Sequence, residues 1–266
     1  MSTDSTTVLA ESALRLVRTI EAQQQVVDAA LSRPARWRGP LRREFVRRAS
    51  DYAARASYAP VFDWLGTVAT TRALDEALLH DVHIRLGGDH DYRARGITIG
   101  GRRLRNPPAA RVPELTRESL RRAADGAEPP PLAAARLQLE LLIIHPFFDG
   151  NGRTARLMSS YVLMTAGYRS TLLTAVEQHT CYDPASYRRS FLELHASGDD
   201  AANWTWLNTS LGAMAVSSQF AAWHRARRST RAERGTRVAI DRQSRDAMAF
   251  QLRRLRAEER DDARSG

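Results

Sequence analysis

HPFFDGNGRTAR, residues 145–156, is the stretch from which the rest of this sequence can be interpreted. Its twelve residues hold a histidine, a carboxylate, a Gly-Asn-Gly turn and two arginines. A packed apolar core needs none of these groups, because a buried polar side chain costs free energy unless it is paired. The stretch therefore predicts a polar site between two apolar helices.

The local backbone of this stretch is set by proline and glycine. Pro146 disfavours helical geometry in the residue before it, so we expect a helix to end there and His145 to lie on a loop. Gly150, Asn151 and Gly152 then allow a sharp turn into a new helix. The exposed N–H groups of such a turn form an anion cradle that the helix dipole reinforces. Phosphate is the ligand that we expect to bind there.

The side chains of the stretch suit the same guest. Arg153 and Arg156 lie one helical turn apart on the same side of the new helix, and their forked donors match phosphate oxygens. A carboxylate beside phosphates repels them unless it holds Mg²⁺, which predicts that Asp149 is a metal ligand. Histidine is well suited to accept a proton near neutral pH. Together these residues predict a nucleotidyl-transfer site, with Phe147 as an apolar anchor.

Composition places this site in a globular protein. The chain has 266 residues, 43% of them hydrophobic and 26% charged, which is enough for one or two cores. No run of eighteen apolar residues occurs, and the first residues lack the pattern of a secretory signal. A single cysteine, Cys181, fits an intracellular setting. We expect a cytoplasmic protein without a membrane partner, and secretion as an effector stays open.

The formal net charge of +10 is a weaker signal than it first looks. All 40 basic residues are arginine, which indicates a coding bias and weakens the case for a nucleic-acid partner. From residue 220 onward, 13 Arg are interleaved with 7 Asp and Glu, a pattern typical of a solvated helix face. We therefore expect no nucleic acid among the partners.

The hydrophobic pattern predicts a mainly α protein. Apolar residues recur at steps of three and four, and residues 132–144 are apolar on nearly all sides, which predicts a central buried helix. Ile97, Thr98 and Ile99, followed by Gly-Gly, predict a small β-hairpin between 92 and 112. The last 47 residues predict one or two arginine-rich helices. Other helices are expected at 8–31, 41–57, 67–86, 114–124, 153–166, 184–196 and 201–216.

The stretch 145–156 resembles the signature of the Fic (Fido) family, His-x-Phe-x-(Asp/Glu)-Gly-Asn-Gly-Arg-x-x-Arg, and matches every fixed position. The likeness extends to YRARGITIGG before the motif, to the helix entering it, to YVLMTAGY after it and to YRRSFLELHASGDDAANWTWL. It covers about residues 65–212. We accordingly divide the chain into N-terminal helices (1–64), a Fic core (65–216) and a basic C-terminal helical tail (217–266).

The resemblance implies a helical core with a β-hairpin flap and the activity of a protein adenylyltransferase. Such an enzyme moves AMP from Mg²⁺-ATP to a Ser, Thr or Tyr hydroxyl of a target protein. Carried over by position, His145 deprotonates the hydroxyl, Asp149 binds Mg²⁺, Asn151 with the backbone of Gly150 and Gly152 holds the α- and β-phosphates, Arg153 neutralises the leaving pyrophosphate, and Arg156 reaches the γ-phosphate.

The resemblance also assigns residues outside the motif. The flap residues Gly96, Ile97, Thr98 and Ile99 would pair with an extended segment of the target and position its hydroxyl. Adenine would lie near Tyr187 and His195. The phosphate-transferring branch of the family has Ala and Lys where this chain has Gly150 and Arg153, which favours AMP transfer here. Transfer of UMP or another nucleotide stays open.

Regulation is implied by a second pattern. Many family members carry (Ser/Thr)-x-x-x-Glu-(Gly/Asn), whose glutamate pairs with the second motif arginine. TVLAES, residues 7–12, supplies Thr7 and Glu11 but has Ser12 in the last position. Glu11 is thus a candidate inhibitory residue, with an ordinary surface glutamate as the alternative. A separate antitoxin chain, as for a toxin of this family, or a homo-oligomer are further expected partners.

The sequence admits two other interpretations. His80 and His83, with Asp81 between them and His90 nearby, have a spacing that zinc ligands can adopt, but no fourth ligand is evident. The alternative function is a nucleic-acid-binding or interaction protein on a Fic-like core, using the basic tail and the arginines around the hairpin. Those arginines are Arg93, Arg95, Arg102, Arg103 and Arg105.

Overall fold

The computed structural model describes residues 3–31, 58–99, 102–103, 106–168 and 184–227. The helix expected at 41–57 and the part of the basic tail beyond residue 227 lie outside these residues. The described helices and strands are α1 (Thr3–Leu31), α3 (Tyr58–Val68), α4 (Glu76–Arg85), β1 (Thr98–Ile99), β2 (Arg102–Arg103), η1 (Ala109–Arg111), α5 (Val112–Ala124), α6 (Pro130–Ile144), α7 (Asn151–Thr165), α9 (Pro184–Ser197) and α10 (Asp200–Arg227).

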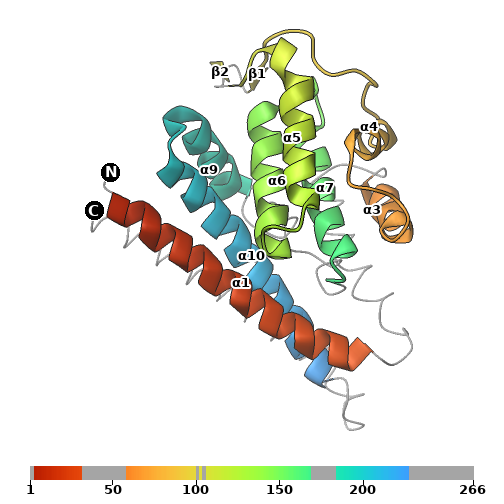
Figure 1. The fold of residues 1–266 in the computed structure, drawn as a ribbon, viewed down its shortest axis with the longest axis vertical. Coiled ribbons are helices and arrows are strands. Elements are labelled where there is room, and N and C mark those ends of the chain that lie inside the picture. Colours follow the sequence, from red (N-terminus) through yellow and green to blue (C-terminus); the bar gives the residue numbers. More distant parts are fainter. Residues whose placement is uncertain (1–2, 32–57, 100–101, 104–105, 169–183, 228–266) are drawn as a thin grey trace.

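The described chain is mainly helical, as the sequence predicts, and α6 lies at its centre (Figure 1). This helix packs against α5, α7 and α10, and eleven of its fifteen residues are buried. A helix that is apolar all round is stable only when neighbours cover every face, so α6 forms the axis of the core. Its C-terminal end delivers the motif, and α7 continues from the motif back along α6.

The two longest helices, α1 and α10, lie side by side along much of their length (Figure 1). Ala13, Val17, Ile20 and Gln24 recur at helical spacing along α1 and are buried. Asn208 on α10 donates from Nδ2 to the Leu9 carbonyl, 2.8 Å away. The first helix is therefore part of the same packed core. None of the described helices combines the length and the apolar character that a membrane span requires.

The helix expected at 67–86 is wrong as a single element. The structure ends α3 at Val68 and begins α4 at Glu76, with Asp75 as N-cap accepting from Leu78 N at 2.8 Å. The Tyr161 hydroxyl of α7 donates to the Arg72 carbonyl at 2.7 Å and holds the intervening turn. An N-cap interrupts helical geometry at its own residue, so the helix restarts there.

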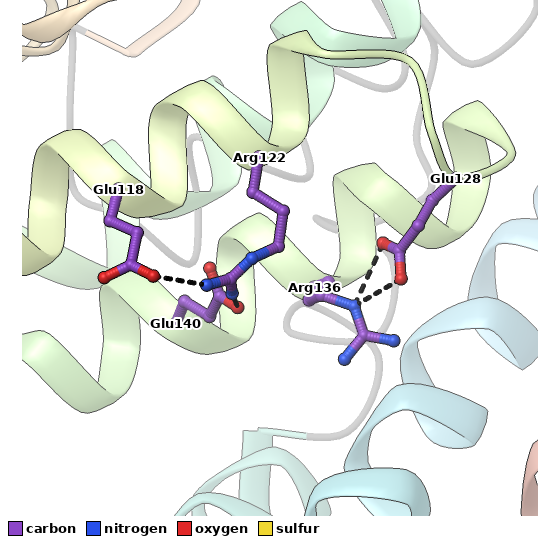
Figure 2. Close-up of polar contacts among 5 residues, drawn as sticks. All are labelled: Glu118, Arg122, Glu128, Arg136 and Glu140. Carbon is purple, nitrogen blue, oxygen red and sulfur yellow. Dashed lines mark hydrogen bonds and ion pairs between the residues drawn. The ribbon is translucent and has the colours of Figure 1, made fainter.

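The exposed side of α5 and α6 carries ion pairs (Figure 2). Arg122 of α5 pairs with Glu118 on its own helix and with Glu140 on α6. Arg136 of α6 holds Glu128 through both carboxylate oxygens, at 2.8 and 3.0 Å. Each pair keeps a partly exposed side chain, so their contribution to stability is modest.

Strands β1 and β2 pair in antiparallel fashion, with Thr98 opposite Arg103 and Ile99 opposite Arg102. The pair follows the loop after α4 and precedes η1, at the end of the molecule where α6 terminates (Figure 1). A short ladder therefore lies where the sequence predicts one. Its role as a flap that positions a target stays a prediction.

Candidate active site

The motif loop begins where α6 is forced to stop. His145 is the C-cap of α6 and adopts φ 53° and ψ 65°, the left-handed region. It is the non-glycine residue with positive φ in the described part of the chain. Pro146 disfavours helical geometry at His145, as expected, and the left-handed turn redirects the chain out of the helix.

The His145 ring is held in one tautomer. Its Nδ1 lies 3.3 Å from the Leu142 carbonyl oxygen, within the buried end of α6. A carbonyl can only accept, so this contact is a hydrogen bond when Nδ1 carries the proton. Nε2 is then unprotonated and can act as a base. Burial lowers the pKa of His145 to about 4, so the neutral ring dominates at neutral pH.

Asn151 fixes the shape of the loop between the two helices. Its Oδ1 accepts from Phe147 N at 2.8 Å, and its Nδ2 donates to the Phe147 carbonyl at 2.8 Å. Phe147 itself is fully buried, as the sequence predicts. Both polar atoms of the Asn151 amide are thus engaged with the loop. In this structure the Asn151 side chain orders the turn that leads into α7.

The cradle itself is the first turn of α7. Gly150 is the N-cap with φ 74°, a conformation that L side chains rarely adopt. The first N–H groups of a helix have no intrahelical acceptor, and the helix dipole places partial positive charge there. A Cβ on Gly152 would approach Arg156 Nη1 to 3.4 Å, so this glycine lies directly against the second motif arginine.

Arg156 is buried without a partner. Its relative exposure is 6%, and its Nε has no hydrogen-bond acceptor. No carboxylate among the described residues pairs with its guanidinium. A buried N–H without an acceptor is unfavourable, which makes the position suited to an anionic ligand. The structure thus shows that Arg156 is buried, which its spacing from Arg153 in the sequence does not predict.

Arg153 and Asp149 lie on the exposed side of the same turn. Arg153 donates from Nη1 to the Leu86 carbonyl at 3.2 Å, and its Nη2 is 3.5 Å from Asp149 Oδ2. The Asp149 side chain is 97% exposed, so this contact is loose. Both residues border a pocket of about 110 Å³ formed with the loop after α4, whose other lining residues include Leu86, Gly88 and Phe148.

Asp149 fits the chemistry of a nucleotide-bound cation. No three His, Cys, Asp or Glu side chains in the described ranges cluster closely enough to hold a metal. The zinc spacing of His80 and His83 therefore gains no support. A cation at Asp149 would depend on phosphate oxygens and waters for its remaining ligands, which is the way Mg²⁺ is usually bound.

His83 packs against the motif loop. Its ring stacks on Phe147, with ring centroids 3.6 Å apart and planes within 6°. Its Nδ1 lies 3.2 Å from Thr154 Oγ1 on α7. Burial lowers the pKa of His83 to about 4, so the ring stays neutral in this apolar setting. The spacing of His80 and His83 in the sequence did not predict that His83 stacks on Phe147.

The residues predicted outside the motif differ in how close they lie to His145. His195 on α9 is buried, its Nε2 has no partner, and its charge is among the influences that lower the pKa of His145. The two rings are therefore neighbours. Tyr187 lies on the same helix, but its side chain is outside the described residues. Gly96 and Ile97 precede β1, which contains Thr98 and Ile99.

The expected contact of Glu11 with Arg156 is not formed. Glu11 is exposed on α1, and its carboxylate is 3.9 Å from Arg15 Nη1 on the same helix. The face of α1 that meets the core carries Ala13 and Val17 instead. Thr7 is likewise exposed. The helical spacing that buries one face of α1 thus turns the candidate inhibitory glutamate toward solvent.

Arg93 is the polar residue that sequence reasoning passed over. It appeared as one of several arginines near the hairpin, yet it is 2% exposed and bonded to the end of α6. Composition cannot separate a buried arginine from its solvated neighbours. Its place immediately before the hairpin, in YRARG, is the signal that was available.

Comparison with known proteins gives a consistent answer for the centre of the chain. Residues 73–163 match the model of the Fic/DOC family. The chain is similar to proteins named protein adenylyltransferase Fic from Aedes aegypti (46% identical over 50 residues, 19% of this chain and 10% of that protein) and Drosophila yakuba (39% over 66 residues, 25% and 12%). The chain spans about a tenth of the length of these curated relatives.

Solved structures share the fold. A Fic domain containing signaling protein from Bacteroides thetaiotaomicron VPI-5482 gives a TM-score of 0.61 at 17% identity, over 79% of this chain and 97% of that one. A Fic family protein from Desulfovibrio desulfuricans G20 gives 0.50 at 22% identity, over 82% and 74%. The similarity in fold extends well beyond the matched segment 73–163.

Proposed function

We propose that this protein, whose residues 73–163 match the model of the Fic/DOC family, is an adenylyltransferase that moves AMP from ATP to a hydroxyl side chain of a target protein. The observation that carries the proposal is Arg156, an arginine with 6% exposure beside the first turn of α7 whose buried Nε has no hydrogen-bond acceptor. It supplies a fixed positive charge next to the N-terminus of that helix. A triphosphate is a ligand whose negative charge and oxygen acceptors would match it.

The triphosphate would lie along the N-terminus of α7. The backbone N–H groups of its first turn would receive the α- and β-phosphates, in the loop that Asn151 holds in shape. Arg156 would bind the γ-phosphate from the buried side, and Arg153 would face the leaving pyrophosphate from the exposed side. Each of these contacts is a charge-assisted hydrogen bond.

His145 would be the catalytic base. With Nδ1–H donating to Leu142, its free Nε2 takes the proton of the target hydroxyl. The hydroxyl oxygen forms a bond to the α-phosphorus, and the bond from that phosphorus to the pyrophosphate oxygen breaks. The products are an AMP ester on the target, pyrophosphate and a protonated His145. The buried His145 ring can hold the proton transiently, because its positive charge would lie near the departing pyrophosphate.

Mg²⁺ would be held by the exposed Asp149 carboxylate together with the nucleotide. When bound, it neutralises phosphate charge. The remaining assignments extend the proposal. The strand Thr98–Ile99 would pair with an extended segment of the target, and the neighbourhood of His195 on α9 would receive adenine.

The proposal is tested by ATP carrying a radioactive label on either the α- or the γ-phosphate. We expect the chain, or a protein of a cell lysate, to incorporate the α-label and not the γ-label. His145→Ala should reduce incorporation by about 10²–10⁴-fold, since general base catalysis is lost. Its affinity for ATP, measured by calorimetry, should change little.

The two labels separate this activity from its rivals. Incorporation of the γ-label would indicate phosphate transfer and overturn AMP transfer. Wild-type rates in His145→Ala would remove His145 from the role of base. Repeating the assay with labelled UTP shows whether the protein selects adenine over uracil, as proposed.

A further inference from the structure

Arg93 closes the C-terminal end of α6. Its Nε donates to the His145 carbonyl at 2.8 Å, and its Nη2 donates to the Ile144 carbonyl at 3.2 Å. Its own backbone N–H donates to the Pro146 carbonyl at 2.9 Å. The last carbonyls of a helix lack intrahelical donors, and a cation there also complements the dipole. Arg93 therefore holds the backbone on both sides of the His145 left-handed turn.

The same guanidinium reaches the base of the hairpin. Nη1 donates to the Arg95 carbonyl at 3.0 Å, and Nη2 also donates to the Pro107 carbonyl at 2.6 Å. Arg95 precedes β1 and Pro107 follows β2, so the two acceptors lie on the entering and the leaving arm of the hairpin segment. One planar group thus joins both arms of the hairpin to the loop that carries His145.

The partners of Arg93 distinguish it from other arginines of the fold. Arg122 and Arg136 bind carboxylates at the surface of α5 and α6 (Figure 2). Arg93 is buried and its four side-chain bonds all end on neutral backbone carbonyls. Its contacts therefore depend on the directions of its fork, and a lysine ammonium cannot reproduce them from one point.

We propose that Arg93 is a positioning residue that fixes the base of the hairpin relative to His145. This inference rests on the proposed function, because the hairpin would present the target and His145 would accept the proton of its hydroxyl. The distance between them is then set by a single buried guanidinium. A displacement of about 1 Å in such a geometry can cost on the order of 10²-fold in rate.

The test compares Arg93→Lys with the matched control Arg136→Lys, which removes a surface guanidinium from α6. Self-incorporation of the α-phosphate label from ATP should fall by about 10²-fold in Arg93→Lys, with the loss in kcat. The affinity for ATP should stay within about twofold, because Arg93 contacts no part of the phosphate cradle. Arg136→Lys should match wild type in both. Wild-type incorporation in Arg93→Lys would overturn the proposal, as would an equal loss of ATP binding.

Amide hydrogen exchange supplies a readout that does not depend on activity. In the wild type, the Arg93 and His145 amides should open together, because the Arg93 side chain binds the His145 carbonyl while the Arg93 amide binds the Pro146 carbonyl that follows it. In Arg93→Lys both should exchange faster, while amides within α5 keep their protection. Independent exchange of the two amides in the wild type would overturn the clamp even if Arg93→Lys failed to fold. A wild type that incorporates no label would refute the proposed function, and exchange alone would then decide the clamp.

Discussion

At the scale of single residues, the site depends on polar side chains that are buried, although in solution they would be hydrated. His145 is buried in a left-handed turn and stays neutral, while Arg156 is buried with its charge unpaired. Both arrangements cost folding free energy, and such costs are typical of functional sites. Substrate binding is the event that makes use of them.

The ionisation of His145 should be visible directly. Its pKa is lowered to about 4 by burial, so its ring should remain neutral as the pH falls from 8 to 5.5. Protonation, and with it loss of the base, should come only below about pH 5. Two-dimensional NMR of the ring, assigned with His145→Gln, measures this. A titration centred near the ordinary value of about 6.5 would contradict the assigned environment.

The sequence predicts the local backbone of the motif loop well and the surroundings of its side chains poorly. Pro146 and Gly150 fix the local backbone by their own conformational limits, so the loop and the N-terminus of α7 were predictable. The burial of Arg156 and the clamp of Arg93 depend on segments far away in the chain. No short pattern encodes such contacts.

At the scale of elements, the loop after α4 is packed against the motif through His83. A Cβ on Gly88 would lie only 2.2 Å from the His83 Nε2 and within 2.6 Å of two further ring atoms. The ring cannot retreat easily, because it stacks on Phe147 and contacts Thr154. The absence of a side chain at residue 88 is therefore a packing requirement.

Gly88→Ala should destabilise the protein by about 1–3 kcal/mol, the usual cost of overpacking a core. The matched control is Gly66→Ala in α3, where an added Cβ meets nothing within 4 Å. Alanine is favoured over glycine inside a helix by roughly 0.5–1 kcal/mol, so the control should be neutral or stabilising. Urea unfolding of both variants checks the pair. Equal effects on stability would show that His83 does not confine residue 88.

The observed element boundaries show where the hydrophobic pattern of the sequence led to a wrong prediction. Helical periodicity runs on through residues 67–86, but the Asp75 cap and the Tyr161 bond to Arg72 break the run. The hairpin was predicted from three residues, and its ladder is correspondingly short. Continuous apolar segments such as α6 were the easiest to assign, because their burial is decided within the segment itself.

At the scale of the whole molecule, the N-terminal helix packs into the core. α1 packs along α10 (Figure 1). Glu11 is exposed, and its carboxylate lies near Arg15. The spacing of Thr7 and Glu11 matched an inhibitory pattern, yet helix phase decides which face meets the core. Phase depends on the partner helix, which the local sequence does not specify.

Binding and folding should oppose each other through Arg156. A buried guanidinium N–H without an acceptor lowers the stability of the protein, and an anionic ligand that accepts from Arg156 would remove that penalty. Arg156→Met keeps much of the apolar stem and deletes the charge, so it should raise the melting temperature without nucleotide. One kcal/mol corresponds to about 2–4 °C for a chain of this size.

The most direct measurement of the central claim is the thermal stability of wild type and Arg156→Met, each with and without Mg²⁺-ATP. The account predicts that Arg156→Met melts higher than wild type alone, by a few degrees. Saturating nucleotide should stabilise the wild type by about 2.7 kcal/mol at a hundred times Kd, and the variant much less. An Arg156→Met protein that melts lower than wild type and is stabilised equally by ATP would contradict a buried arginine reserved for phosphate.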